Sequence, residues 1–464
     1  MATTASAAGQ TLVATQLMNP ADYGLFVVAF LVLQFLRAVA EFGLHEAIIQ
    51  RPTTPAERSG LWVFSLMSGL VAYGLFAVVA WPLAALNDDP RLVPLLLLLG
   101  LVCPFHAIAQ VHAAVLEREM RFDQVGRAEV AGAIVGFTAM LAAAVAGFGA
   151  MALVIGAVAT ALVRSAGILI VAGRDWWPAM VMPSAALAPQ LRFGAYQLGT
   201  RLTNTAVNRL DQIIISAFFG TEIVGIYGFA WMLIIDPIMR INGVVGRVAL
   251  PAFARLRHAP RRLAGGFMTL ETILTLLTAP LIIGGAVVAP VFFTIFMPAA
   301  WQPAVPILQI LAVASLIRAI NNPVGLLALA TGRARLMFVW TLSALSVQVV
   351  VFTTAASSLS FLQFVVAVAV FNGAVMLASY GVLVRTVIGP SAGRWIMAVA
   401  PNLAVAAVMG AVLLAVQAAI AIDDIGRFVA LVLLGIVVYA STLIAFRRDT
   451  LALARRFLLA RRPG

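Results

Sequence analysis

The sequence predicts an all-α integral membrane protein with about 14 transmembrane helices. Three observations predict this class: a mean hydropathy of +1.04, a hydrophobic share of 63% with only 10% charged residues, and a series of long apolar runs. A soluble globular protein is about half apolar and about a quarter charged. Each run is long enough for a helix that crosses a hydrocarbon core of about 30 Å.

The apolar runs are separated by short breaks rich in Pro, Gly and Asp, and no connection is long enough for a soluble domain. A weaker, more polar segment at 1–18 comes first, so we expect a first helix that is shortened at its start. The clear runs then cover 24–44, 61–86, 92–116, 128–146, 149–172, 193–219, 223–246, 266–296, 304–330, 336–356, 359–384, 395–420 and 426–446.

The longest polar connection divides the chain into two halves of six helices. It predicts an N-terminal lobe at 1–172, a cytoplasmic linker at 173–192 and a C-terminal lobe at 193–384. Two appended helices at 385–446 and a basic cytoplasmic tail at 447–464 follow. A faint repeat aligns Gly24 with Gly225. It fits two parallel halves related by an axis along the membrane normal.

The distribution of arginine predicts the orientation. All 30 basic residues are Arg, and 22 of them lie in alternate connections and the tail, against two, Arg91 and Arg427, in the others. Cytoplasmic loops carry the excess of Lys and Arg. Both termini are therefore expected in the cytoplasm, with the protein in a bacterial inner membrane.

Composition excludes several classes of site. The absence of Lys excludes a Walker A loop, and the single Cys103 excludes an intrachain disulfide. The four His include no pair at the helical spacing used by metal ligands, so no metal site is expected. Because the charge of +12 lies mostly in the cytoplasmic connections, we expect no nucleic-acid partner.

A polar stripe runs along the helix expected at 193–219. Helical geometry places its members within an arc of about 80°, with Arg209 just outside; they are Gln197, Arg201, Asn204, Asn208 and Asp211. Three central charges cost about 9 kcal/mol on an insertion scale, whereas the apolar residues return about 3 to 6 kcal/mol. The stripe therefore faces a water-filled cavity or charged partners, and structural ion pairs are the alternative.

Other charges at membrane depth fall into two kinds. Arg37 with Glu41, and Asp236 with Arg240, are spaced as ion pairs within one helix. Arg318 shares a face with Asn321 and Asn322 just before Pro323, and it has no acid in its own helix. A structural kink at that proline is an equal alternative to an anion site. The lone Glu271 is interpreted as interfacial rather than as a proton relay.

Four stretches resemble the polysaccharide exporter family, the Wzx-type flippases of lipid-linked oligosaccharides within the multidrug/oligosaccharidyl-lipid/polysaccharide superfamily. The similarity is closest to the colanic-acid exporter branch and covers almost the whole chain. The stretches are NPADYGLFVVAFLVLQFLRAVAEFGLHEAIIQR, NRLDQIIISAFFGTEIVGIYGFAW, RVALPAFARL, which lies in a predicted loop, and NPVGLLALATGRAR.

The resemblance implies two six-helix lobes around a central cavity, with two further helices outside. It also implies alternating-access export of an oligosaccharide repeat unit on undecaprenyl pyrophosphate for surface polysaccharide assembly. Guanidinium groups hold phosphate oxygens in a bidentate fork. Arg201, Arg209 and Arg318, with Asn204, Asn208 and Asn322, are therefore predicted to contact the substrate.

The remaining charged candidates are Asp211, Asp236, Arg240, Arg37 and Glu41, which would tune the arginines or bind a coupling ion. No cofactor is expected beyond a coupling H⁺ or Na⁺, and no catalytic residue. Membrane lipids are partners, and a polymerase and glycosyltransferases of the same pathway are expected ones. The alternatives are a drug/cation antiporter or a peptidoglycan-precursor flippase of the same superfamily, and, from another class, a membrane-embedded polysaccharide polymerase or ligase.

Overall fold

The computed structural model is all-helical over the residues it describes, which are 15–50, 53–172, 176–180, 187–389, 392–419 and 425–446. Twelve of its helical segments are long and apolar enough to cross a membrane. The helix at 188–219 is not among these, as its charged stripe leads one to expect, and the tail at 447–464 lies outside the described residues. The predicted fold class is confirmed.

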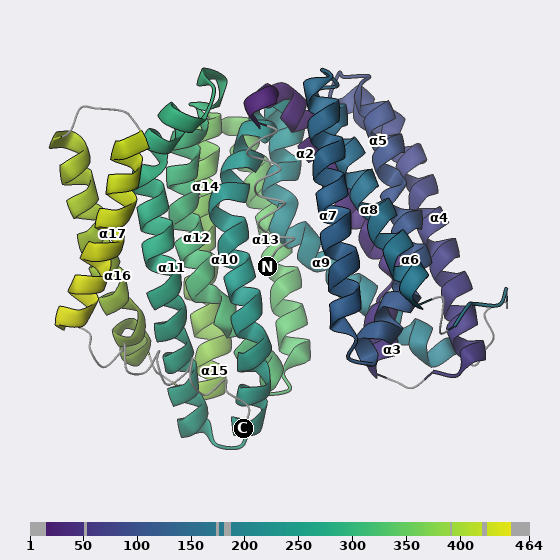
Figure 1. Cartoon of the computed structure of the whole chain (residues 1–464). Coiled ribbons are helices and arrows are strands. Elements are labelled where there is room, and N and C mark those ends of the chain that lie inside the picture. The colour runs from purple at the N-terminus through teal and green to yellow at the C-terminus, as the bar shows by residue number, and fades with distance from the viewer. Residues whose placement is uncertain are drawn as a thin grey trace. The chain divides into compact units, whose positions relative to one another are not determined.

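The chain forms two compact units, 1–228 and 229–464. The first contains α2 (Pro20–Glu41), α3 (Leu44–Gln50), α4 (Pro55–Leu86), α5 (Leu92–Gly100), α6 (Val102–Arg118), α7 (Phe122–Val145), α8 (Ala150–Ala172), α9 (Ala188–Phe219) and the start of α10 (Thr221–Leu256) (Figure 1). The sequence places the run at 193–219 with the C-terminal lobe. In the structure α9 packs against α2 and α3, so it belongs to the first compact unit.

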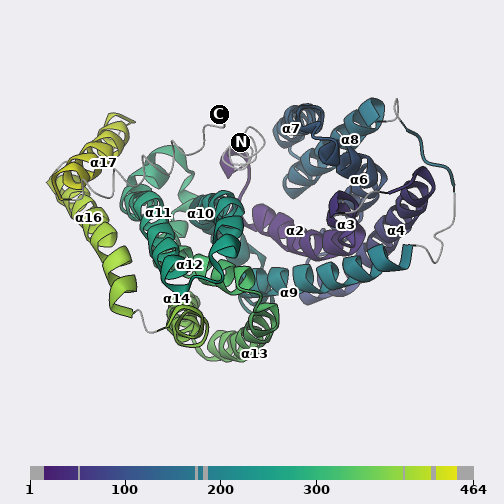
Figure 2. The same cartoon turned by 90° about the horizontal axis from the view of Figure 1, so that it is seen from below.

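The second unit contains the rest of α10 and the helices after it. These are α11 (Pro260–Phe296), α12 (Ala304–Ala330), α13 (Ala334–Ser358), α14 (Phe361–Ser379), a π-helical turn (Tyr380–Val384), α15 (Arg385–Ile388), α16 (Ala392–Ala419) and α17 (Ile425–Phe446), with a short 3₁₀ turn at Ala299–Trp301. Viewed along the helices, α16 and α17 lie side by side, as do α7 and α8 in the first unit (Figure 2).

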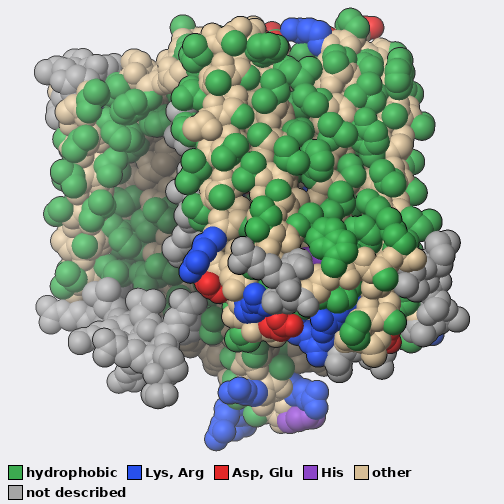
Figure 3. Space-filling view, turned by 45° about the vertical axis from the view of Figure 1, so that its right-hand side comes forward, with side chains coloured by type: hydrophobic (Ala, Val, Ile, Leu, Met, Phe, Trp, Pro, Cys, Tyr) green, Lys and Arg blue, Asp and Glu red, His purple; other side chains and the backbone are tan. Residues whose placement is uncertain are grey.

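One expected break is helical in the structure: the stretch RVALPAFARL, expected as a loop, continues α10 through Pro251 to Leu256. The helix α12 continues through Pro323, where the sequence predicts a kink within one span. Both prolines remove one backbone hydrogen bond without ending the helix, because the rest of the ladder and the packing hold it. Figure 3 shows hydrophobic side chains over most of the visible face, with most of the charged side chains near its lower end and a few at its upper edge.

Glycines allow the closest helix approaches in the first unit. A Cβ on Gly24 would lie 1.7 Å from the backbone oxygen of Thr221, and one on Gly225 would lie 2.2 Å from that of Pro20. The two glycines that the internal repeat aligns therefore contact one another where α2 and α10 begin. No side chain fits at either position without moving backbone.

Candidate functional site: charged clusters at membrane depth and an apolar pocket

A network of ion pairs joins α2, α3 and α9 in the first unit. The predicted pair is present on α2, where Arg37 Nε donates to Glu41 Oε1 at 2.7 Å. Arg201 on α9 donates from its two terminal nitrogens to Glu41 and to Glu46. Because the two carboxylates belong to different helices, their charge-assisted hydrogen bonds to one guanidinium join α2, α3 and α9 strongly.

The turn after α2 explains how both glutamates reach one arginine. Phe42 has φ 44° and Gly43 has φ 63°, so two residues in the left-handed region interrupt the helix before α3 begins. A Cβ on Gly43 would lie 2.6 Å from Cβ of Gln197 on α9. Glycine is therefore required here, because α9 passes directly over the turn.

A histidine extends the network toward α8. His106 Nε2 lies 3.1 Å from Glu41 Oε1, and its Nδ1 lies 3.3 Å from a terminal nitrogen of Arg164. Because a guanidinium only donates, Nδ1 accepts, and the proton of a neutral imidazole sits on Nε2. Arg164 also lies 3.7 Å from Glu129. Three arginines thus face three glutamates, Glu41, Glu46 and Glu129, and the cluster is balanced in charge.

Other residues of the predicted stripe on α9 have partners outside the Arg201 ion pairs. Asp211 is buried, with 1% of its surface exposed, and its Oδ2 accepts a hydrogen bond of 2.7 Å from the Tyr227 hydroxyl. Arg209 Nε donates to Gln34 at 3.3 Å. Asn208 donates to the backbone oxygen of Asn204 at 2.8 Å, and Asn204 is exposed. The stripe is therefore divided among separate partners.

Arg318 on α12 has different surroundings in the second unit. Its guanidinium carbon lies 4.8 Å from the ring centre of Trp231, and its Nε donates to Asn372 on α14 at 2.9 Å. One terminal nitrogen, NH1, is buried and has no hydrogen-bond partner among the described residues. The neighbouring Asn321 accepts from Ser379 at 2.5 Å, and Asn322 is half-buried. The guanidinium is thus positioned but not neutralised.

The pair predicted from Asp236 and Arg240 lies on α10 of the same unit. Asp236 is half-buried and Arg240 is exposed. Their role as an ion pair or a coupling site stays a prediction. No group of three or more metal-binding side chains occurs within the part of the chain that the structure describes.

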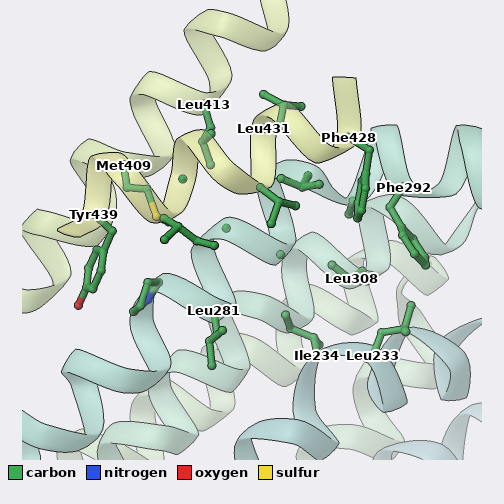
Figure 4. A pocket seen from close by; sticks show the side chains of 18 of the residues that line it. Leu233, Ile234, Leu281, Phe292, Leu308, Met409, Leu413, Phe428, Leu431 and Tyr439 are labelled. Carbon is green, nitrogen blue, oxygen red and sulfur yellow. The ribbon is translucent and has the colours of Figure 1, made fainter. Parts of the chain in front are cut away.

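An apolar pocket of about 720 Å³ lies between helices of the second unit (Figure 4). Hydrophobic side chains and glycines of α10, α11, α12, α16 and α17 line it, and Tyr439 brings a hydroxyl that donates to the Leu276 backbone oxygen at 2.8 Å. Gly284, Gly285 and Gly435 leave room on the lining where a side chain would stand. The chemistry of the lining suits a hydrocarbon chain.

Several contributors were not singled out from the sequence. Five residues that contact a predicted arginine or its partner were missed; they are Glu46, His106, Arg164, Trp231 and Asn372. Asn372 had a usable signal, since it is an amide inside the apolar run at 359–384. The others lie on elements distant in sequence from the arginines, so spacing within one helix could not find them.

Comparison with known proteins decides the family. Residues 13–306 match the family model described as polysaccharide biosynthesis protein. The chain belongs to this family. It is 32% identical over 310 residues to the teichuronic acid biosynthesis protein TuaB of Bacillus subtilis (strain 168), covering 66% of this chain and 64% of that protein. This chain therefore spans slightly less than two thirds of the length of TuaB.

Two further relatives carry names from polysaccharide pathways. The lipopolysaccharide biosynthesis protein WzxC of Escherichia coli (strain K12) is 25% identical over 330 residues, covering 71% of this chain and 67% of that protein. The succinoglycan biosynthesis transport protein ExoT of Rhizobium meliloti (strain 1021) is 26% identical over 299 residues, covering 64% and 60%. The predicted family is confirmed.

Solved structures show the fold. The lipid II flippase MurJ in an inward closed conformation matches with a TM-score of 0.75 at 12% identity, over 97% of this chain and 98% of that one. An inward-facing multidrug resistance MATE transporter of the MOP superfamily matches with a TM-score of 0.64 at 16% identity, over 82% and 93%. At such identities the likeness shows a shared fold of a multi-pass membrane protein.

Proposed function

We propose that the chain is a flippase that moves undecaprenyl-pyrophosphate-linked oligosaccharide repeat units from the cytoplasmic to the outer leaflet. The observation that carries the proposal is Arg318, because its guanidinium is held by Trp231 and Asn372 and keeps one buried N–H group without a partner. Such a group is suited to a phosphate oxygen and unsuited to a cationic drug. The names of TuaB, WzxC and ExoT, and the fold shared with a lipid II flippase, support the same substrate class.

A lipid-linked oligosaccharide has an anionic head and a hydrocarbon tail, and the second unit offers a group for each. Arg318 provides an anion contact, and the apolar pocket lined by α10, α11, α16 and α17 provides a hydrocarbon surface. Asn322 and, from the first unit, Arg201, Arg209, Asn204 and Asn208 are the further proposed contacts. Arg201 can take that role only when Glu41 and Glu46 release it, since both hold it in the structure.

The proposed cycle is alternating access in a bacterial inner membrane, with both termini in the cytoplasm. No covalent change in the substrate is needed, so we propose a transporter without a catalytic step. Asp211, Asp236, Arg240, Arg37 and Glu41 are proposed to tune the arginines or to bind a coupling H⁺ or Na⁺. Glycosyltransferases that build the repeat unit and a polymerase that consumes it are the proposed partners.

The test is the fate of the lipid-linked intermediate. In cells lacking the gene, the complete repeat unit should accumulate on the cytoplasmic leaflet, and purified protein in vesicles should restore its movement across the bilayer. Vesicles with the Arg318→Ala variant should lose that movement at equal protein content. Normal surface polysaccharide in the deletion strain, together with no movement in wild-type vesicles, would contradict the proposal.

A further inference from the structure

Glu271 on α11 is fully buried, with 0% of its surface exposed. Its neighbours on the same helix, Phe267, Leu270 and Leu274, belong to a buried hydrophobic cluster that also contains Trp395 on α16. This burial contradicts the interpretation of Glu271 as an interfacial residue. The spacing along α11 could not reveal it, because the face that covers Glu271 belongs to a helix more than 100 residues later in the chain.

Both carboxyl oxygens of Glu271 lack a hydrogen-bond partner among the described residues. Two more buried polar atoms on α16, Trp395 Nε1 and Asn402 Oδ1, also lack one. Asn402 lies beside the turn of α11 that follows Glu271, because its Nδ2 donates to the Thr272 backbone oxygen at 2.9 Å and to Thr275 Oγ1 at 3.0 Å. Thr272 in turn donates to the Ala398 backbone oxygen at 3.3 Å. Hydrogen bonds therefore join α11 and α16 close to a buried carboxyl group that has no hydrogen-bond partner among the described residues.

Among the described residues, Glu271 forms no ion pair and no side-chain hydrogen bond. On α16 and the π-helical turn, the Trp395 ring stacks on Tyr380 with centroids 5.1 Å apart. The hydroxyl of Tyr439 on α17 donates a hydrogen bond to the Leu276 backbone oxygen. Arg318 on α12, which also packs against α11, is half-buried, and its Nε donates to Asn372. The other arginines of the surrounding elements are exposed; they are Arg240, Arg247, Arg255, Arg261, Arg262, Arg385 and Arg394.

An isolated carboxylate in such surroundings is strongly disfavoured, and a group of this kind takes up a proton instead. A bound metal ion is the other way to balance the charge. Ions such as Ca²⁺ take roughly six to eight oxygen ligands, whereas the unsatisfied oxygens here are the two of Glu271 and Asn402 Oδ1. One proton needs no such shell, so the protonated acid fits the site better.

We propose that Glu271 is a proton-binding site at the α11–α16 interface. The carboxyl group is neutral while the two helices are packed, and it releases its proton when water reaches it. In that step the O–H bond breaks, the proton passes to water and a carboxylate remains. A role for this proton as the coupling ion rests on the proposed flippase function, but the site itself does not.

Infrared spectroscopy of the full-length protein in lipid tests the site directly. At neutral pH, the difference spectrum between wild type and Glu271→Gln should contain the C=O stretch of a protonated carboxylic acid. The matched control is Glu222→Gln at the start of α10, which should remove no such band because the Glu222 side chain is exposed to solvent. A folded Glu271→Gln protein without the band in its difference spectrum would show an ionised Glu271 and overturn the proposal.

Two further measurements keep the proposal decidable. Should Glu271→Gln fail to fold, Trp395→Phe should shift the carboxylic acid band of an otherwise intact protein, and an unchanged band would count against the site. In vesicles, a pH gradient should speed movement of the lipid-linked substrate by wild type about tenfold and leave Glu271→Gln unaffected. An equal gradient response in the variant would overturn the coupling role, whereas no movement by wild type would instead refute the flippase function.

Discussion

Arg201 on α9 and Arg318 on α12 are both arginines on long helices, yet their surroundings differ in kind. Arg201 is held by two glutamates from α2 and α3, in a cluster where positive and negative charges balance. Arg318 is held by an aromatic ring and an amide, which position the guanidinium without removing its charge. The first arrangement fastens helices together, and the second leaves a cation for a ligand.

The difference has an energetic basis. A central arginine costs about 3 kcal/mol on an insertion scale, and a neutralising partner or an aqueous cavity must offset that. For Arg201 the two glutamates, Glu41 and Glu46, supply that offset. For Arg318 the cation–π contact supplies about 0.5–2 kcal/mol, so a remainder is left for an anionic substrate. Arg318 is therefore the stronger candidate for substrate contact and Arg201 the stronger candidate for stability.

The largest expected effect is on transport by Arg318→Ala. A hydrogen bond to a charged group contributes about 1.5–3 kcal/mol, so the rate of flipping in vesicles should fall by about 10- to 100-fold. The thermal unfolding midpoint should change little, because the side chain contacts one amide and one ring. Arg318→Lys should restore only part of the rate, since the charge returns without the planar fork. Full activity in Arg318→Ala at normal protein content would place Arg318 with the structural residues.

The second effect is on stability, through Arg201→Ala. Breaking a buried ion pair destabilises a fold by about 3–5 kcal/mol, and the 34% exposure of the Arg201 side chain should reduce this to about 2 kcal/mol. The thermal unfolding midpoint in detergent should fall clearly. Adding Glu46→Gln should recover about half of the loss, because Glu46 is then not left as an unpaired carboxylate, whereas Glu41 keeps Arg37. An unchanged midpoint in Arg201→Ala would refute the fastening role.

The sequence predicted one side of this comparison and missed the other. Arg318 has no acidic partner in its own helix, and in the structure it has none among the described residues either. Arg201 also has no acid close by on α9 except Asp211, but its glutamates come from α2 and α3, more than 150 residues earlier. Pairs at helical spacing, such as Arg37 and Glu41, are readable from sequence.

The fold class could be predicted because hydropathy and run length follow from the membrane itself. Interior contacts could not, because a bundle is assembled from faces whose partners depend on packing and not on spacing. Asp211 shows this clearly: it shares the arc with Arg201, yet it bonds to the Tyr227 hydroxyl. Glu271 shows it again, since helices distant in sequence, α12 and α16 among them, pack against α11.

A smaller effect should follow from the side chain that positions Arg318. Asn372→Leu removes the amide acceptor at 2.9 Å from Arg318 Nε. A typical hydrogen bond contributes about 1 kcal/mol, so the rate of flipping should fall about fivefold, with Arg318 still present. Ser346→Ala on α13 is a matched control, because its hydroxyl is exposed and bonds only within its helix, to the Leu342 backbone oxygen. Equal rates in both variants would mean that Asn372 does not position the arginine.

The smallest expected effect is on stability, through an ion pair between a solvent-exposed arginine and an aspartate. In the connection before α5, Arg91 donates to Asp89 at 2.7 Å and to Asp22 at 3.0 Å, with 60% of the Arg91 side chain exposed. The hydrogen bond from Arg91 holds the pKa of Asp89 below its usual range. Stability from this pair is therefore present above about pH 4, the usual value for Asp, and is lost as the pH falls through the lower, folded-state pKa.

Because solvent screens exposed pairs, Asp89→Asn should lower the free energy of unfolding by less than about 1 kcal/mol at neutral pH. The difference between wild type and variant should vanish in acid, and thermal unfolding as a function of pH measures both. The loss in Arg201→Ala should be several times larger and should depend less on added salt, because a partly buried pair is screened less than an exposed one. A salt dependence as strong for Arg201→Ala as for Asp89→Asn would mean that the Arg201 network is an ordinary surface ion pair, and the contrast with Arg318 would then rest on Arg318 alone.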